Sequence, residues 1–181
     1  MQTLWTQGQI SVAVGDITRF EGDAIVNAAN RTLLGGGGVD GAIHRAAGRD
    51  LLAACRHLRE SEWPDGLPVG EVALTAGFAL PARHVIHTVG PVYAKSEDRA
   101  DQLASCYRKS LELAGGHGFE RIAFPAISTG VYGYPPADAA QVVWQTLTET
   151  LPAWPKLEVT LVFFSRTDAD TFLGEVRPLP E

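Results

Sequence analysis

Residues 35–48 read GGGGVDGAIHRAAG, so four consecutive glycines, Gly35 to Gly38, stand directly before a segment with the spacing of a helix. Ordering a glycine run costs entropy, and a simple turn needs only one or two glycines. A loop that leads into a helix exposes unpaired backbone N–H groups and the positive end of the helix dipole, which favours anions and phosphates above all. The run therefore predicts a loop whose backbone approaches a phosphate group.

Short apolar stretches alternate with amphipathic ones on both sides of this loop, which predicts an α/β fold. The expected strands are Gln9–Val14, Ala24–Ala28, Glu71–Ala76, His84–Val89, Arg121–Ala126 and Leu157–Phe164. The expected helices are Val39–Ala47, Asp50–Glu60, Ala100–Ala114, Ala137–Thr150 and Ala169–Val176. The polar loops Ser61–Leu67 and Ala94–Arg99 are too short to be interdomain linkers, so we expect a single domain over residues 1–181.

Composition excludes several classes of protein. The formal net charge is -6 and the sequence pI about 5.3, which argues against sequence-independent binding of nucleic acid. No apolar run approaches the roughly 20 residues that span a bilayer, and the N-terminal MQTLWTQGQ does not resemble a signal peptide. We therefore expect a cytoplasmic protein without a membrane partner. Cys55 and Cys106 have neither paired spacing nor a distinctive flanking motif, which favours reduced, packed thiols over catalytic ones.

A second junction repeats the pattern of the first. The predicted strand 121–126 runs into ISTGVYGY, residues 127–134, and a helix is expected after Pro135. Ser128 and Thr129 offer hydroxyl donors, and the two glycines of this turn let it wrap tightly. Because ligands of open α/β sheets bind at the carboxyl ends of the strands, two such loops can hold a diphosphate from both sides.

Two known phosphate-binding motifs help to narrow the kind of diphosphate ligand. There is no GxxxxGK[ST] sequence, which argues against a P-loop kinase or NTPase. Gly36, Gly38 and Gly41 do match GxGxxG, but they follow the second predicted strand, and Asn27 and Asn30 interrupt its end. No acidic residue ends a strand at the expected distance of about 20 residues. A nicotinamide-dependent oxidoreductase is therefore only a distant competitor.

Three polar residues lie at predicted strand ends. Asp16 follows the first predicted strand and has two open interpretations, a turn cap or an acceptor for an exocyclic amine such as that of adenine. Asn27 and Asn30 lie in IVNAAN, where amides in an apolar segment must find partners. Either these amides cap the strand end, or they point at ribose hydroxyls or at a water near Asp40. Two asparagines at the same edge of the sheet favour the second interpretation.

Asp40 is the sharpest candidate for chemistry. An acid in the first turn of a helix is favoured by the helix dipole, so capping is the plainer interpretation. A carboxylate beside a phosphate loop, however, repels the ligand that the loop attracts. That penalty is understandable if the acid is a general base that activates water, and we favour this role.

Histidines and aromatic residues give weaker signals. The histidines show no spacing typical of metal ligands, so no metal site is expected. His87, in the apolar VIHTVG, is predicted to be a hydrogen-bonded core residue. Phe163 and Phe164 end the strongest predicted strand, and by alternation one packs inward while the other reaches the rim, where a base could stack.

Together these motifs resemble the macrodomain family, and the glycine run followed by Val-Asp-Gly resembles its MacroD-type branch. The likeness runs from about Gly8 to the last predicted helix. Besides the glycine run, its motifs are GDIT at Gly15–Thr18, IVNAAN at Ile25–Asn30, GEVALTAGFALPARHVIHTVGPVY at Gly70–Tyr93 and FPAISTGVYGYP at Phe124–Pro135.

The resemblance implies a three-layer α/β/α sandwich with a central mixed sheet that binds ADP-ribose. By position, Asp16 and Ile17 match the residues at the adenine amine, and Phe164 matches the aromatic at the adenine. Asn27 and Asn30 match asparagines near the distal ribose, and Asp40 matches the base of branch members that hydrolyse ADP-ribosyl esters. The phosphate loops would comprise Gly37, Gly38 and Val39, and Ile127, Ser128, Thr129, Gly130, Val131 and Tyr132.

The resemblance also implies an activity. MacroD-type proteins remove mono-ADP-ribose from aspartate and glutamate side chains, deacetylate O-acetyl-ADP-ribose, and release ADP-ribose from nucleic-acid ends. No cofactor and no metal is implied, since the Cys/His set of the zinc-dependent branch is not found in this sequence. The chain departs from close MacroD-type relatives mainly at Ser61–Leu67, where a Trp-Pro-Asp-Gly-Leu stretch replaces a shorter loop containing Cys-Pro. The alternative is an ADP-ribose reader without turnover; readers often lack the acid at Asp40.

Overall fold

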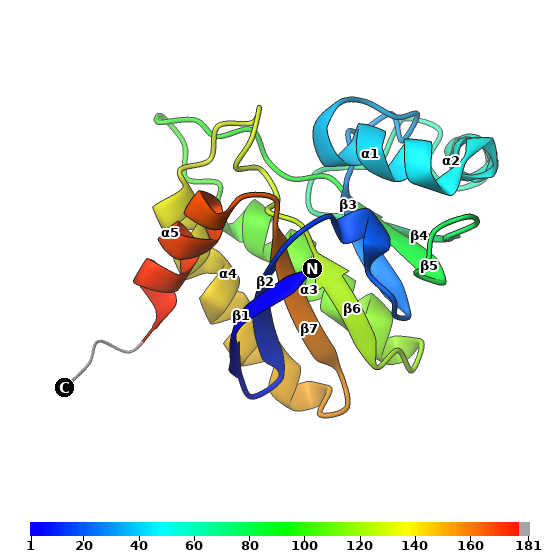
Figure 1. Ribbon diagram of the computed structural model, residues 1–181. Helices are drawn as coiled ribbons and strands as arrows, with labels where there is room; N and C mark the ends of the chain where they lie inside the picture. The colour runs from blue at the N-terminus through cyan, green and yellow to red at the C-terminus, as the bar shows by residue number, and fades with distance from the viewer. Residues whose placement is uncertain (178–181) are drawn as a thin grey trace.

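The computed structural model of the protein describes residues 1–177. Its sheet has the strand order β1-β2-β7-β6-β3-β5-β4 (Figure 1). The pairs β1–β2 and β4–β5 are antiparallel and the other pairs are parallel, which confirms the prediction of a mixed sheet. The strands are β1 (Gln2–Gln7), β2 (Ile10–Val14), β3 (Ala24–Ala28), β4 (Val72–Ala76), β5 (His84–Thr88), β6 (Arg121–Phe124) and β7 (Glu158–Phe163).

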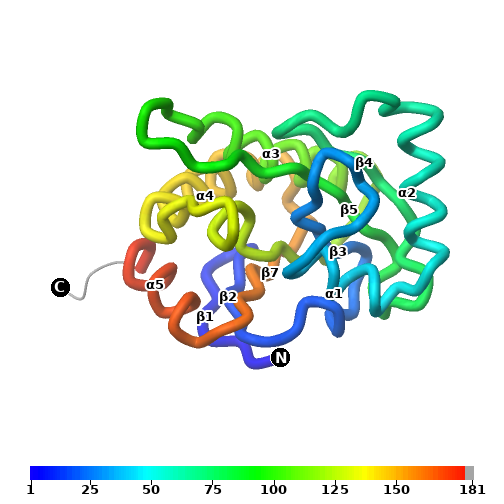
Figure 2. The backbone as a smooth tube through the Cα atoms, turned by 90° about the horizontal axis from the view of Figure 1, so that it is seen from above, coloured from blue at the N-terminus to red at the C-terminus, as the bar shows by residue number. Residues whose placement is uncertain are grey.

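Helices cover both faces of this sheet, so the three-layer sandwich is confirmed (Figures 1 and 2). The longer helices are α1 (Gly38–Ala47), α2 (Arg49–Ser61), α3 (Ala100–Gly116), α4 (Pro136–Thr150) and α5 (Arg166–Val176). Helices α1 and α2 pack on one face, and α3, α4 and α5 pack on the other. Two short 3-10 helices, η1 (Ile17–Arg19) and η2 (Leu151–Ala153), complete the set in the described part of the chain.

The alternation of side chains along β3 decides which face carries polar groups. Ala24 and Val26 belong to the core under α3, α4 and α5, whereas Ile25 belongs to the core under α1 and α2. Asn27 therefore points to the α1–α2 face. It lies opposite His87 of β5 in the parallel register. The sheet thus places an amide and an imidazole side by side beneath α1 and α2.

The sequence-based boundaries need several corrections. Strand β1 was not expected, because its side chains are exposed or half-buried and give no apolar pattern; the segment predicted as the first strand is therefore the second. Strand β6 ends at Phe124, two residues early, because Pro125 has no N–H to donate. Helix α5 begins at Arg166 instead of Ala169, because the Ser165 hydroxyl caps it by accepting from the backbone N–H of Asp168.

The segment 61–67 does not form a free polar loop. Ser61 is the last residue of α2. The Arg59 guanidinium donates hydrogen bonds to the carbonyl oxygens of Trp63, Pro64 and Thr32, with N···O distances of 3.0, 3.2 and 2.9 Å. Leu67 is fully buried and belongs to the core under α1 and α2. These contacts hold the segment against the chain that follows β3.

The two cysteines lie in opposite cores. Cys106 packs under α3 and Cys55 packs under α2, and both are buried and free. This confirms the prediction of packed thiols. Within residues 1–177, no helix has the length and apolar character needed to cross a membrane.

Candidate functional site

A cleft of about 760 Å³ opens above the carboxyl ends of β2, β3, β6 and β7. It lies between the glycine run that leads into α1 and the loop that follows β6. The cleft is lined by every residue expected to contact a ligand apart from one: Asp16, Ile17, Asn30, Gly37, Gly38, Val39, Asp40, Ile127, Ser128, Thr129, Gly130, Val131, Tyr132 and Phe164. The exception is Asn27, which is fully buried and lies below the cleft.

The glycine run is explained by backbone conformation and by close packing. Gly35 and Gly38 have φ angles of 92° and 57°, which side chains rarely adopt. A Cβ on Gly41 would lie 2.6 Å from the carbonyl oxygen of Gly36, so the loop folds directly onto the helix. Gly37 caps α1 without a side-chain hydrogen bond, and a Cβ on it would meet nothing within 4 Å. The start of α1 therefore faces the cleft as bare backbone.

The second loop is supported from below by Tyr107 of α3. Its hydroxyl donates to the carbonyl oxygen of Pro125 at 3.3 Å and accepts from the N–H of Ile127 at 3.4 Å. Ser128 has a φ of 66°, a strained conformation for a residue with a Cβ. Its buried Oγ has no hydrogen-bond partner within the described residues. The Oγ packs closely against Gly90, where an added Cβ would lie 2.2 Å from it, so the close approach of these two segments requires a glycine at that position.

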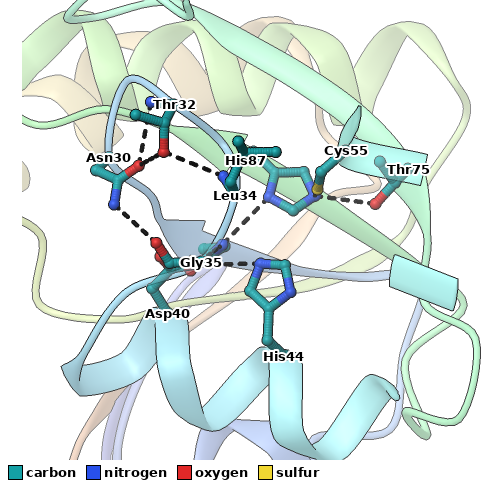
Figure 3. A network of polar contacts seen from close by, with 10 residues as sticks. Asn30, Thr32, Leu34, Gly35, Asp40, His44, Cys55, Thr75 and His87 are labelled. Carbon is teal, nitrogen blue, oxygen red and sulfur yellow. Dashed lines mark hydrogen bonds and ion pairs between the residues drawn. The ribbon is translucent and has the colours of Figure 1, made fainter. Parts of the chain in front are cut away.

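The Asp40 carboxylate lies at the junction of the glycine run and α1 and is 5% exposed. Its Oδ1 accepts a hydrogen bond from Asn27 Nδ2 at 2.8 Å, and His44 Nε2 lies 3.4 Å from the same oxygen (Figure 3). The His44 contact is electrostatic, since this ring nitrogen makes no hydrogen bond within residues 1–177. No described residue donates to Oδ2, so one carboxylate oxygen is held and the other is free for a water or a ligand.

Burial raises the pKa of Asp40, and the Asn27 hydrogen bond and the nearby His44 oppose that shift. A carboxylate with a raised pKa is a stronger base than an ordinary one. The geometry and the electrostatics therefore agree with a role in accepting a proton.

Asn30 braces the glycine run. Its Nδ2 donates to the carbonyl oxygen of Gly35 at 2.9 Å, and its Oδ1 accepts from the backbone N–H and the hydroxyl of Thr32 (Figure 3). The residue also lines the cleft. Asn27, in contrast, reaches Asp40 and does not line the cleft, so of the two amides only that of Asn30 belongs to a residue that borders the cleft.

Asp16, Phe163 and Phe164 also line the cleft. Asp16 caps η1, because its Oδ1 accepts from the N–H and the hydroxyl of Thr18, and the hydroxyl bond lowers its pKa. The capping interpretation is thus correct, and Asp16 still lines the cleft. Phe163 packs against Phe172 with ring centroids 5.4 Å apart, whereas Phe164 is 89% exposed. The predicted division between an inward and an outward phenylalanine is confirmed.

His44 and His87 lie near Asp40, and the sequence alone did not predict their contacts there. His44 follows Asp40 by four residues on α1, a spacing that predicts contact on a helix. His87 is a buried, hydrogen-bonded core residue, as predicted, but its bond to Asn27 depends on the register of β3 and β5. Within residues 1–177, no three His, Cys, Asp or Glu side chains gather where they could hold a metal ion.

The fold and this cleft define an α/β/α protein with a ligand site at the carboxyl ends of its parallel strands, bordered by two backbone loops. The Macro domain family matches residues 26–143. The chain therefore belongs to the Macro domain family.

Similar proteins come from diverse organisms. A macro domain-containing protein of Streptomyces nogalater is 54% identical over 92% of this chain and 91% of its own length. A protein of Cronobacter turicensis named O-acetyl-ADP-ribose deacetylase is 49% identical over 92% of this chain and 93% of its own. The solved structure of a variant Oceanobacillus iheyensis macrodomain with ADP-ribose superposes with a TM-score of 0.91 at 44% identity, covering 97% of this chain and 96% of that one.

Proposed function

We propose that this protein binds ADP-ribose in the cleft and hydrolyses ADP-ribosyl esters, removing mono-ADP-ribose from aspartate and glutamate side chains and deacetylating O-acetyl-ADP-ribose. The observation that carries the proposal is the carboxylate of Asp40, which is buried at the edge of a backbone loop with one oxygen held and the other free. Two relatives of this chain support the choice of substrate by what they bind or by what they are named.

The ligand lies across the cleft in an order that the residues suggest. The diphosphate occupies the space between the start of α1 and the loop after β6, where α1 begins without a side-chain cap and leaves its first backbone N–H groups available. Adenine lies toward Phe164, whose exposed ring offers a stacking surface, and toward Asp16. The distal ribose then lies toward Asn30 and Asp40, at the other side of the diphosphate.

In the reaction, Asp40 accepts a proton from a water that attacks the ester on the distal ribose. The raised pKa of Asp40 favours proton transfer from water. The phosphate groups are held by backbone N–H groups, which are neutral and add no charge that would repel the carboxylate. The products are an alcohol, on ADP-ribose, and a carboxylic acid. Hydrolysis in water labelled with oxygen-18 separates the two routes, since attack at the ester carbonyl labels the carboxylic acid and attack at the anomeric carbon does not.

The competing function is a reader that binds ADP-ribose without turnover, and one variant decides between them. Asp40→Ala should leave ADP-ribose affinity within about threefold while lowering hydrolysis of glutamate-linked mono-ADP-ribose by about 10²- to 10⁴-fold, the usual contribution of a general base. Calorimetric titration measures the affinity, and release of ADP-ribose from a modified protein, beside O-acetyl-ADP-ribose, measures the rate. Native turnover in the variant would remove Asp40 from the mechanism, and a wild-type protein that binds but never hydrolyses would be a reader.

A further inference from the structure

A chain of buried polar groups extends from Asp40 away from the cleft and ends on β4. Asn27 Nδ2 lies 2.8 Å from Asp40 Oδ1 and 3.2 Å from His87 Nδ1. His87 Nε2 lies 2.9 Å from Thr75 Oγ1 and 3.9 Å from Cys55 Sγ (Figure 3). Asn27 and His87 are fully buried and Thr75 is 7% exposed. Such groups are costly to bury, so their arrangement calls for an explanation beyond packing.

The proton positions along this chain follow from its chemistry. An ionised carboxylate only accepts hydrogen bonds, so the Asn27 side chain must turn its NH₂ group, not its oxygen, toward Asp40. The same NH₂ group then donates to His87 Nδ1, which must carry a lone pair. Burial lowers the pKa of His87 to about 3, so the ring is neutral and its one proton sits on Nε2, facing Thr75.

The amide of Asn27 depends on His87 for its orientation. Asn27 Oδ1 has no hydrogen-bond partner within the described residues. Apart from Asp40 itself, His87 is therefore the one described group that holds the amide. If His87 loses its acceptor, the amide can rotate and the bond that fixes Asp40 Oδ1 weakens.

We propose that His87 is a positioning residue for ester hydrolysis, which holds the Asp40 carboxylate in the orientation that accepts a proton from water, through the side-chain amide of Asn27. This inference rests on the proposed function, because it assigns a task in that reaction. His87 does not line the cleft. Its effect is on the rate of the chemical step and not on the affinity for ADP-ribose.

Two variants of similar size test the acceptor itself. His87→Leu removes the acceptor and places an apolar side chain between Asn27 and Thr75, whereas His87→Asn restores an amide oxygen near the place of Nδ1. We expect His87→Leu to lower kcat about tenfold or more through misplacement of the carboxylate, with ADP-ribose affinity within about threefold. His87→Asn should recover most of kcat although it is the less favourable side chain to bury. A role in packing alone predicts the opposite ranking.

Thr75→Val adds an isosteric variant that removes the group facing His87 Nε2, and it should also lower kcat without weakening ADP-ribose binding. Its matched control is Thr146→Val on α4, where the buried hydroxyl bonds only to the carbonyl oxygen of Val142 in its own helix. The control should keep native kcat. The proposal is overturned if His87→Leu keeps native kcat, if His87→Asn is no better than His87→Leu, or if both threonine variants behave alike.

A readout without turnover separates this proposal from the proposed function. Carbon NMR of the Asp40 carboxyl, assigned with Asp40→Asn, follows its titration in the wild type and in both His87 variants. Because the Asn27 bond lowers the pKa of Asp40, that pKa should rise in His87→Leu and stay near the wild-type value in His87→Asn. His44 on α1 and Cys55 on α2 also face Asp40 and are the same in all three proteins. An unchanged pKa in His87→Leu contradicts the positioning role even if the protein proves to be a reader.

Discussion

The two faces of the sheet bury different kinds of side chain. Under α3, α4 and α5 the core is apolar, and buried hydroxyls such as Ser110 and Thr146 bond to carbonyl oxygens of their own helices. Under α1 and α2 the core holds Asn27, His87 and Thr75, which bond to one another across three strands. These two helix hydroxyls bond within their own helix, whereas the polar groups of the second face form a network across three neighbouring strands, β3, β5 and β4.

Polar groups are buried in this protein mainly beside the cleft. A polar core is less stabilising than an apolar one of the same volume, and it demands that each group find a partner. The network under α1 and α2 ends at Asp40, the one residue of the chain of contacts that lines the cleft. We infer that one face provides stability and that the other gives up some stability to fix a carboxylate.

A cavity in the apolar face should affect stability without affecting catalysis. Leu111 of α3 is fully buried, and Leu111→Ala should lower the free energy of unfolding by about 2–5 kcal/mol. The folded protein should keep its native kcat and ADP-ribose affinity, because the helix lies on the face away from the network. Urea denaturation gives the first quantity and single-turnover assays give the second. A large loss of turnover in the folded protein would show that the two faces are not separate.

The converse variant acts on the polar face. Asn27→Leu removes both donors to Asp40 and His87 while keeping the branched shape of the side chain. We expect kcat to fall about 100-fold, or about 2.7 kcal/mol in activation free energy, with a smaller loss of stability than Leu111→Ala. Parallel denaturation and rate measurements on the two variants provide the test. If Asn27→Leu proves the more destabilising variant and the more active one, the division of roles is incorrect.

Asp40 should also make the free energy of unfolding depend on pH. Burial holds the pKa of Asp40 above its ordinary value of 3.8 in the folded protein. As pH rises, the unfolded chain therefore ionises first, and the folded state loses stability until pH exceeds the raised pKa. Asp40→Asn removes this loss, so the variant should gain stability relative to the wild type between about pH 3 and pH 7. Chemical denaturation at both pH values measures the gain. A relative stability that is independent of pH, or that falls, would contradict the raised pKa.

Much of this architecture could be predicted from the sequence, because apolar spacing and glycine placement are local signals. The run at Gly35–Gly38 indicated a loop entering a helix, and α1 begins there. Strand β1 was missed because QTLWTQ has mostly exposed side chains, and its pairing with β2 is a tertiary contact. The start of α5 was missed because a serine cap, not an apolar pattern, sets it.

The candidate site also has residues that the sequence predicts and residues whose positions depend on tertiary contacts. The residues that line the cleft could be named from the loops and from the family resemblance. The position of Asn27 below Asp40 could not, because it depends on which face of β3 the amide occupies once the helices are packed. The same holds for His87, since only the register of β3 against β5 brings it to Asn27. Asn27 and His87 are 60 residues apart in the sequence.

The position of the ligand can be seen in a crystal structure of the protein with ADP-ribose. We expect the diphosphate between the start of α1 and the loop 127–132, with the distal ribose close enough to Asp40 Oδ2 for one water, at about 3 Å, to bridge them. Asn27 should remain bonded to Oδ1. A distal ribose that lies away from Asp40, or a carboxylate turned so that neither oxygen reaches the cleft, would contradict it.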